Sequence, residues 1–508
     1  MATKIFTEIL IIILKNVQST QDLRSSLLVN RFWCKVTTPI LWELTLCQDL
    51  HWINYKKMRK KSLFIRTYLS CMDTQARTLI TQNGFDLSSS PPHATFDYPS
   101  FIRDFRIENL AYFISIYSQK IIVSYLDNYY NNNNKSIIIK SRILFYEICK
   151  LIINRCTFLD SFKLTRVPKL LFENFLNSDL ICSILKLPSA SKIFKKLETF
   201  VSATINDELT RPLYESLALI CDNFLNMDLE FKSESQVLLL EKLIGVQKRL
   251  ENLSITDNGY INSNSLLCVI INQKRLKRLR LISLRFYNFE EKSSPIGQST
   301  SLQELYIENC SGLYKLDCLF FASLFTQLSS FRLRNTFDAF PRDFIIKIFE
   351  TANVNLKNIC LDLCQRIPSD VVSAILNYCK KITELVLCNL SSEQVIVIFN
   401  NNFNDLRRFS FDCVKGLNAN KLLCQMGESV PESLETVEIR MGIFSADSLR
   451  KFFEGWCRKG VGGNKKMIVK RQVRRRKLSD EHRKIIEKYG TELYCLLFKV
   501  SPWEALWQ

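Results

Sequence analysis

Residues 276–281 read Leu-Lys-Arg-Leu-Arg-Leu, and residues 302–307 repeat the same apolar spacing as Leu-Gln-Glu-Leu-Tyr-Ile. Large apolar residues in this arrangement recur eight times in succession, and the first position of each copy falls at 250, 276, 302, 328, 356, 382, 406 and 434. The steps are therefore 24, 26 or 28 residues long. Chance clustering would not hold this interval through seven steps. Weaker copies begin earlier, at 224, 197 and 159.

A fixed period of 20–29 residues with this string resembles the leucine-rich repeat. The resemblance implies an α/β fold, a horseshoe-shaped solenoid of strand–helix repeats of about 26 residues. The second half of a repeat supports a helix, because Val372, Ile375 and Cys379 after Ser369 recur at helical spacing. Residues 342–350 and 391–399 predict equivalent helices. An irregular, wholly helical solenoid is the alternative.

Some of the 18 cysteines have a place in this pattern. Cys310 and Cys364 stand three residues after a predicted strand, where a short polar side chain would satisfy the backbone of the turn. No Cys-x-x-Cys pair occurs, which argues against zinc ribbons and thioredoxin-like redox sites. We expect reduced thiols that pack as small apolar groups.

The first 46 residues predict three short helices that carry more apolar surface than they can bury among themselves. Residues 3–17 form an almost wholly apolar helix, a second opens at Asp22, and a third follows Arg31. Exposed Ile, Leu and Trp side chains on so small a unit predict a docking surface.

The order E-I-L-x-x-I-L, D-L-x-S-x-L-L-V-N-R-x-W-C and P-I-L-W in this region resembles an F-box of the fungal type. Ile5-Phe6 replaces the usual Leu-Pro at the start of the first helix, which removes a first-turn proline, although Phe6 could supply the lost contact. The resemblance implies docking on a Skp1-like adaptor. The residues it assigns to that contact are Ile9, Leu10, Ile13, Leu28, Val29, Trp33, Leu41 and Trp42.

An F-box followed by leucine-rich repeats is a recognised family arrangement, and it implies the substrate-receptor subunit of an SCF-type cullin–RING ubiquitin ligase. Such a subunit is not an enzyme, because it works by holding a target protein near the ligase. The rival interpretation is a repeat scaffold without ligase association, in which the N-terminal helices cap the solenoid and use the same residues as internal core.

The concave strand face is where we expect the target protein to bind. In each strand the residue between the last two apolar positions, and its neighbours two away, point outward. Six basic and six acidic residues occupy these positions, which predicts a protein-binding mosaic and disfavours nucleic acid. Ordinary solvated strand faces are the alternative. The candidates, with Tyr306 as an aromatic anchor, are Arg278, Arg280, Glu304, Tyr306, Glu308, Arg332, Arg334, Asp362, Glu384 and Arg408.

Four segments follow from these patterns: the F-box at 1–46, a helical connector with a flexible Asn-rich loop at 47–150, the repeat array at 151–457, and a basic last repeat with a C-terminal cap at 458–508. Residues 458–488 contain 13 Lys or Arg and three acidic residues. Within them, Lys470–Lys477 fits a nuclear localisation signal, a nucleic-acid patch or a charged edge strand, and we favour the edge strand.

Composition limits the possible functions further. The 508 residues carry 69 Lys and Arg against 50 Asp and Glu, and only three histidines. We expect no metal or cofactor site, because no P-loop, Gly-x-Ser-x-Gly elbow or zinc spacing occurs. The longest early apolar run, Ile9–Leu14, is too short to span a bilayer and no signal-peptide pattern accompanies it. We therefore expect no membrane partner, and a cytoplasmic or nuclear location.

Overall fold

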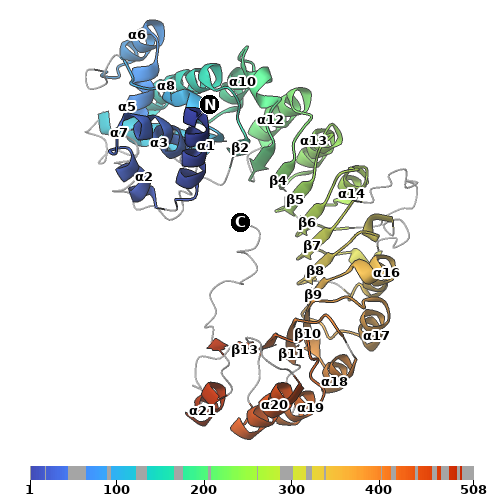
Figure 1. The fold of residues 1–508 in the computed structure, drawn as a ribbon. Coiled ribbons are helices and arrows are strands. Elements are labelled where there is room, and N and C mark those ends of the chain that lie inside the picture. Colours follow the sequence, from blue (N-terminus) through green and yellow to red (C-terminus); the bar gives the residue numbers. More distant parts are fainter. Residues whose placement is uncertain are drawn as a thin grey trace. The chain divides into compact units, whose positions relative to one another are not determined.

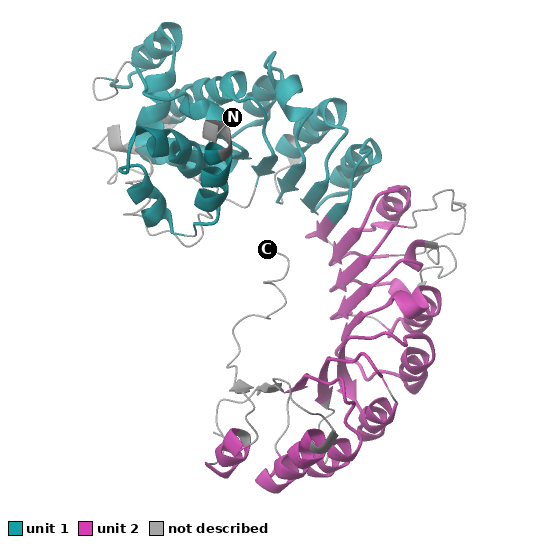
Figure 2. Cartoon of the chain, viewed as in Figure 1, with its two compact units in different colours: residues 1–253 teal, residues 254–508 magenta. Residues whose placement is uncertain are grey.

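The computed structural model divides the chain into two compact units, residues 1–253 and 254–508, shown in teal and magenta in Figure 2. The structure describes residues 2–17, 19–43, 64–87, 93–121, 134–164, 176–203, 207–259, 261–286, 301–315, 323–336, 339–401, 403–413, 419–440, 444–459, 466–470, 480–488 and 492–494. Each unit combines parallel strands with helices (Figure 1).

Unit 1 contains four strands that pair in parallel and in sequence order: β1 (Asp104–Arg106), β2 (Ser161–Leu164), β3 (Thr199–Ser202) and β4 (Asn226–Phe231). The division between the units falls within β5 (Asn252–Asp257). The helices of unit 1 are α1 (Ala2–Lys15), α2 (Thr20–Ser26), α3 (Arg31–Glu43), α5 (Phe64–Cys71), α6 (Thr74–Gln82), α7 (Ile107–Ile121), α8 (Asn134–Arg155), α10 (Ser178–Leu185), α11 (Ala190–Phe194), α12 (Asp207–Ile220), α13 (Glu234–Gly245) and the 3₁₀ helix η2 (Tyr98–Phe101).

Unit 2 continues the strand–helix alternation, again with parallel pairs in sequence order. Its strands are β6 (Arg278–Ile282), β7 (Glu304–Glu308), β8 (Ser330–Arg334), β9 (Asn358–Asp362), β10 (Glu384–Leu390), β11 (Arg408–Cys413), β12 (Thr436–Arg440), β13 (Lys466–Lys470) and β14 (Glu492–Tyr494). Its helices are α14 (Asn264–Ile271), α16 (Arg342–Ala352), α17 (Ser369–Tyr378), α18 (Ser392–Asn400), α19 (Ala419–Glu428), α20 (Ala446–Lys459), α21 (Asp480–Lys488), and the 3₁₀ helices η3 (Leu313–Lys315), η4 (Ser323–Phe325) and η5 (Asn353–Asn355).

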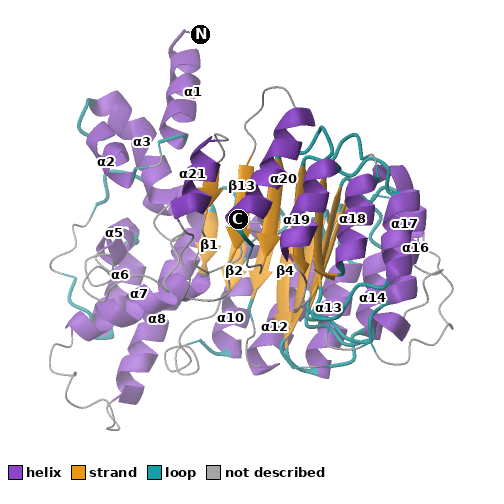
Figure 3. Cartoon of the chain, turned by 90° about the horizontal axis from the view of Figure 1, so that it is seen from below, coloured by secondary structure: helices purple, strands orange, loops and turns teal. Residues whose placement is uncertain are grey.

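Helices α16–α20 lie along one face of the unit 2 sheet (Figure 3). The opposite face of this sheet is called the open face below. The apolar residues of the repeat point toward the helices and form the core. In register, these are Leu279, Leu305, Phe331, Ile359, Leu385, Phe409 and Val437, each no more than 6% exposed.

An aromatic column fills the equivalent layer of unit 1. The ring centroids of Phe105, Phe162, Phe200 and Phe224 follow one another at 6.0, 6.0 and 5.7 Å. Phe224 lies three residues before Met227, the register partner of Phe200, whereas Phe105, Phe162 and Phe200 share one register position on β1, β2 and β3. All four rings are at most 1% exposed. Aromatic residues thus replace leucine in this layer, and each fills more volume between the strand and its helix.

The chain takes the same backbone conformation at the ends of three unit 2 strands, just after β7 and β8 and at the next-to-last residue of β10. Asn309, Asn335 and Asn389 have positive φ angles between 48° and 58°, a region that asparagine tolerates better than most residues. Cys310 is fully buried, and its Sγ lies 3.5 Å from the carbonyl oxygen of Leu281 and 3.4 Å from that of Glu308. The expected role of Cys310 in the turn is confirmed, whereas Cys364 is exposed.

The structure confirms the strand–helix repeat. All eight predicted strands and the three weaker ones are present as β2–β12, which excludes a wholly helical solenoid. The three predicted helices are α16, α17 and α18, and Ser391 caps α18 through a capping box with Gln394. The sheet also extends beyond residues 151–457, because β1 lies in the expected connector and β13 and β14 lie in the expected last repeat.

The structure describes only the first residue of the basic run Lys470–Lys477. Lys470 ends β13, which pairs with β12 on one side and β14 on the other, so this first residue of the run does not lie at a sheet edge. Residues 471–477, most of the Asn-rich stretch 128–134, and residues 495–507 of the expected cap lie outside the described residues. No helix within the described ranges is long and apolar enough to cross a bilayer.

Candidate functional site

The three N-terminal helices have a small core of their own. Leu10 and Leu14 of α1 pack with Leu23 of α2 and with Val36 and Ile40 of α3, all at most 9% exposed. Local hydrogen bonds set the helix starts, because Ser19 accepts a bond from the backbone of α2 and Asn30 accepts one from the backbone of α3. The three helices are therefore held together without help from a partner.

One side of this unit carries uncovered apolar side chains, which together are called the α1–α3 apolar surface. Its members, with their exposed fractions, are Phe6 (56%), Ile9 (50%), Ile12 (62%), Ile13 (55%), Leu28 (87%), Val29 (57%) and Phe32 (38%). The first four share one side of α1, because residues three, four and seven apart lie on the same helix face.

Contacts connect the parts of this surface. The rings of Phe6 and Phe32 lie 5.8 Å apart, so the start of α1 meets the start of α3. Leu28 and Val29 occupy the turn between α2 and α3, a few residues before Phe32. Phe6 stands where the F-box pattern has proline, and this aromatic contact gives that residue a structural role.

The eight residues assigned to the adaptor contact fall into three groups by their exposure: four exposed, one buried and three half-buried. Four of them, Ile9, Ile13, Leu28 and Val29, lie on the α1–α3 apolar surface. The assignment of Leu10 to the adaptor contact is wrong. Leu10 is 3% exposed in the three-helix core, because it lies on the side of α1 that faces α2 and α3.

The remaining three residues are half-buried. Trp33 and Leu41 pack against the three-helix core. Trp42 joins α3 to the rest of unit 1, because its ring lies 4.4 Å from that of Tyr98 and its Nε1 donates a hydrogen bond of 3.3 Å to the hydroxyl of Tyr68. Trp42 therefore attaches the helices to the following segment, as the capping interpretation expected of this region.

Sequence reasoning missed Ile12 and Phe32 as surface residues. The signal for Ile12 is its place in an unbroken apolar run from Ile9 to Leu14. A helix that is apolar on every side needs cover both from its own domain and from something else. The sequence does not show which side faces the neighbouring helices.

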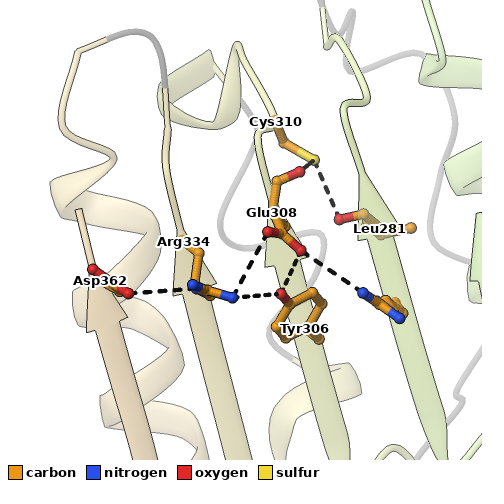
Figure 4. Close-up of polar contacts among 7 residues, drawn as sticks. Leu281, Tyr306, Glu308, Cys310, Arg334 and Asp362 are labelled. Carbon is orange, nitrogen blue, oxygen red and sulfur yellow. Dashed lines mark hydrogen bonds and ion pairs between the residues drawn. The ribbon is translucent and has the colours of Figure 1, made fainter. Parts of the chain in front are cut away.

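The second candidate region is the open face of unit 2, where the expected charged residues form a ladder across strands (Figure 4). Arg334 lies between Glu308 at 3.8 Å and Asp362 at 3.4 Å. On the other side, Arg280 lies 3.8 Å from Glu308, and Arg278 pairs with Glu304 at 3.4 Å. Most of these charges therefore neutralise one another.

Tyr306 is not available as an aromatic anchor, which corrects that expectation. It is 6% exposed, and the guanidinium of Arg280 lies over its ring at 4.9 Å. Its hydroxyl donates to Glu308 and accepts from Arg334 at 3.5 Å. Burial, followed by the bond to Glu308, raises the pKa of Tyr306. Ring and hydroxyl are both engaged within the ladder.

A second group of charges lies at strands β10–β12. Arg408 pairs with Glu384 at 3.3 Å and with Glu438 at 3.0 Å, and the side chain of Glu438 is fully buried. Burial raises the pKa of Glu384, although Arg408 and Arg332 act in the opposite direction. The guanidinium of Arg408 thus compensates two carboxylates that have little access to water.

Four buried or half-buried thiols in the described part of the chain are shifted away from reactivity. Burial raises the pKa of Cys71 to about 11 and the pKa of Cys221, Cys310 and Cys379 to about 12. A nucleophilic cysteine needs the opposite shift, because the thiolate is the reactive form. Within the described part of the chain, no group of three His, Cys, Asp or Glu residues is placed to hold a metal ion.

Comparisons with known proteins add little. No model of a known protein family matches the sequence, and no curated protein matches it. Among solved structures, one crystal structure of a complex of Rad7 and Elc1 from yeast is similar over 76% of the present chain and 92% of that chain. Its sequence identity is 13% and its TM-score 0.35, too low to indicate a shared function or fold.

Proposed function

We propose that this protein is the substrate-receptor subunit of an SCF-type cullin–RING ubiquitin ligase. The helices α1–α3 dock on a Skp1-like adaptor, and the repeats hold a target protein. The single observation that supports the docking is the α1–α3 apolar surface, which stays exposed although the three helices already have a complete core. Together with the F-box-like sequence order, it fits a unit whose apolar side is covered by another protein.

The exposed side chains are of the type and size that stabilise an interface. Burying an aliphatic side chain that was fully exposed is worth about 1.5–3 kcal/mol. Leu28 is 87% exposed, and it projects from a turn next to Val29. Such a residue suits a pocket of a partner, while the stripe on α1 suits a groove.

The rival capping interpretation accounts for Trp42 but not for α1. A cap would bury Ile9 and Ile13 against the repeats, and these residues are at least 50% exposed. The ligase interpretation uses both observations, because Trp42 fixes the three helices to unit 1 and the opposite side of α1 stays open to an adaptor.

The proposed role requires no catalytic group in this chain. A receptor accelerates ubiquitin transfer by raising the effective concentration of the target near the enzyme that carries ubiquitin. The same proposal places the protein in the cytoplasm or the nucleus, where thiols stay reduced.

A co-purification experiment tests the proposal. The full chain and an Ile9→Ser/Ile13→Ser variant are each expressed with a tag, and the recovered proteins are probed for a Skp1-like adaptor and a cullin. We expect both with the wild type and at least tenfold less with the variant, at unchanged thermal stability. Recovery of neither protein with the wild type, or equal recovery with both, would refute the ligase assignment.

A further inference from the structure

The border of the α1–α3 apolar surface carries charge of one sign around the turn between α2 and α3. Residues 23–42 contain three basic side chains and no carboxylate. The three are Arg24 in α2 and Arg31 and Lys35 in α3, and all are exposed. Among the residues that the structure describes, none of the three lies within 4 Å of a carboxylate. They are called the basic border below.

The basic border adjoins the apolar side chains that remain uncovered in this turn. Arg24 precedes Leu28 by four residues, and two backbone hydrogen bonds keep the chain in tight turns between them. Arg31 comes directly before Phe32, and Lys35 follows Phe32 by three residues on the same helix. Residues three or four apart on a helix are neighbours on its surface. Exposed Leu28 and Phe32 are therefore flanked by cations.

The carboxylates of the three helices lie elsewhere. On α1, exposed Glu8 and exposed Lys15 contribute one charge of each sign. Asp22 stands in the first turn of α2, where the positive end of the helix dipole stabilises a carboxylate. Glu43 is at the opposite end of α3 from the turn. Among the described side chains of the three helices, the uncompensated positive charge is thus concentrated beside the α2–α3 turn.

The positions of these cations are unfavourable in the free chain. Arg31 is the first residue of α3, where the helix dipole disfavours a cation, and the first turn of α3 contains no acidic residue. Lys35 follows one turn later, and like charges at this spacing repel. Asp97 caps η2, which packs against α3, but it is paired with Arg155 at 3.4 Å. The folding of unit 1 therefore gives no reason for this cluster of charge.

We infer that the face of the adaptor that covers the α2–α3 turn carries carboxylates around an apolar pocket. The pocket receives Leu28 and Phe32, and the carboxylates pair with the basic border. This inference rests on the proposed function and adds the charge of the partner. Charges at the rim of an apolar contact act mainly on the association rate, because they steer the two proteins before the apolar groups are buried.

An anionic membrane is the other kind of partner that suits apolar side chains bordered by cations. The α1 part of the apolar surface argues against it, because Glu8 lies one residue before Ile9 and four before Ile12. A flat lipid surface over the whole apolar surface would bring this carboxylate against anionic headgroups. A protein can place its own carboxylates beside the basic border alone.

The test measures the association rate of the full chain with a purified Skp1-like adaptor by surface plasmon resonance. We expect the rate to fall at least fivefold when NaCl is raised from about 0.1 to about 1 M, because the Debye length shortens from about 10 to about 3 Å. An Arg24→Gln/Arg31→Gln/Lys35→Gln variant should associate about tenfold more slowly at low salt, since each exposed pair is worth about twofold. It should also lose most of the salt dependence.

A matched control separates the basic border from the overall charge. Lys186→Gln/Lys192→Gln/Lys196→Gln changes three exposed lysines at α10 and α11 and alters the net charge equally. Its association rate should stay within twofold of the wild type, and an equal loss in both variants would overturn the inference. If the basic-border variant unfolds at a lower temperature, Lys35→Glu should still slow association about fivefold while Lys35→Arg should not. No difference between these two would also overturn it.

The outcomes distinguish this inference from the proposed function. A wild type that does not bind the adaptor at any salt concentration would overturn both. Binding with equal association rates for the wild type and the basic-border variant would leave the docking in place and overturn the acidic border. Vesicles of phosphatidylcholine and phosphatidylserine should not sediment the chain. Sedimentation that is lost in the basic-border variant would assign these cations to a lipid surface instead.

Discussion

Replacing Leu28 by alanine should weaken the adaptor contact without changing the stability of the chain. Leu28 is 87% exposed in the turn between α2 and α3. The substitution removes three carbon atoms, each worth about 0.8 kcal/mol when an interface buries it. About nine-tenths of this surface is open in the free chain, so the loss on binding is about 2 kcal/mol, or roughly 30-fold in Kd.

The same calculation predicts that Leu28→Ala has almost no effect on folding. About one-tenth of the removed surface is buried in the free chain, so the free energy of unfolding should change by less than about 0.5 kcal/mol. A matched control is available in α12, where Leu219 is 88% exposed and lies outside the α1–α3 apolar surface. Leu219→Ala removes the same atoms from an equally exposed site and should not affect the adaptor.

Isothermal titration calorimetry of the full chain with a purified Skp1-like adaptor measures the effect, and thermal denaturation checks folding. We expect Leu28→Ala to bind about 30-fold more weakly than the wild type, and Leu219→Ala to match the wild type. A Kd for Leu28→Ala within twofold of the wild-type value would refute the assignment of the α2–α3 turn to the adaptor contact. So would an equal loss of affinity in the two variants.

Two other predictions concern buried residues. Leu10→Ala should lower the stability of the three-helix unit by about 2–5 kcal/mol, because Leu10 is 3% exposed in its core, and hydrogen exchange of α1–α3 would show whether protection is lost. For Glu384, a raised pKa means that the folded state binds more protons than the unfolded state, so its contribution to stability is greatest below pH 4.5 and falls as the pH rises. Glu384→Gln should therefore gain stability relative to the wild type between pH 4 and pH 7 in urea titrations, and a relative loss over that range would contradict the shift.

The repeat around β1 was not predicted from the sequence, because it is separated from the next copy by an unusually long segment. Ile102, Phe105 and Ile107 have the apolar spacing of the repeat and are at most 2% exposed around β1. The next copy begins at residue 159, more than twice the usual step away, because α7, α8 and the segment between them intervene. A search by period therefore starts one repeat too late, although the local pattern was present.

The sequence predicted which charged residues lie on the open face, but not whether they are free to bind a partner. Alternation along the strands correctly placed Arg280, Glu308 and Arg334 on the open face. Which strand's carboxylate meets which guanidinium depends on the register between strands 26 or 28 residues apart, and on side-chain conformations. These determine that the ladder neutralises itself and that Arg280 covers Tyr306.

The sequence by itself determined the strand–helix repeat and its buried positions, because a period held through many copies leaves one way to bury the apolar residues together. It also determined that α1 is apolar on nearly every side. Only the tertiary structure decided that Leu10 faces the core while Ile9 and Ile13 face outward. Isoleucine and leucine are equally suited to a core and to an interface, so the packing of α2 and α3 against one side of α1 makes the distinction.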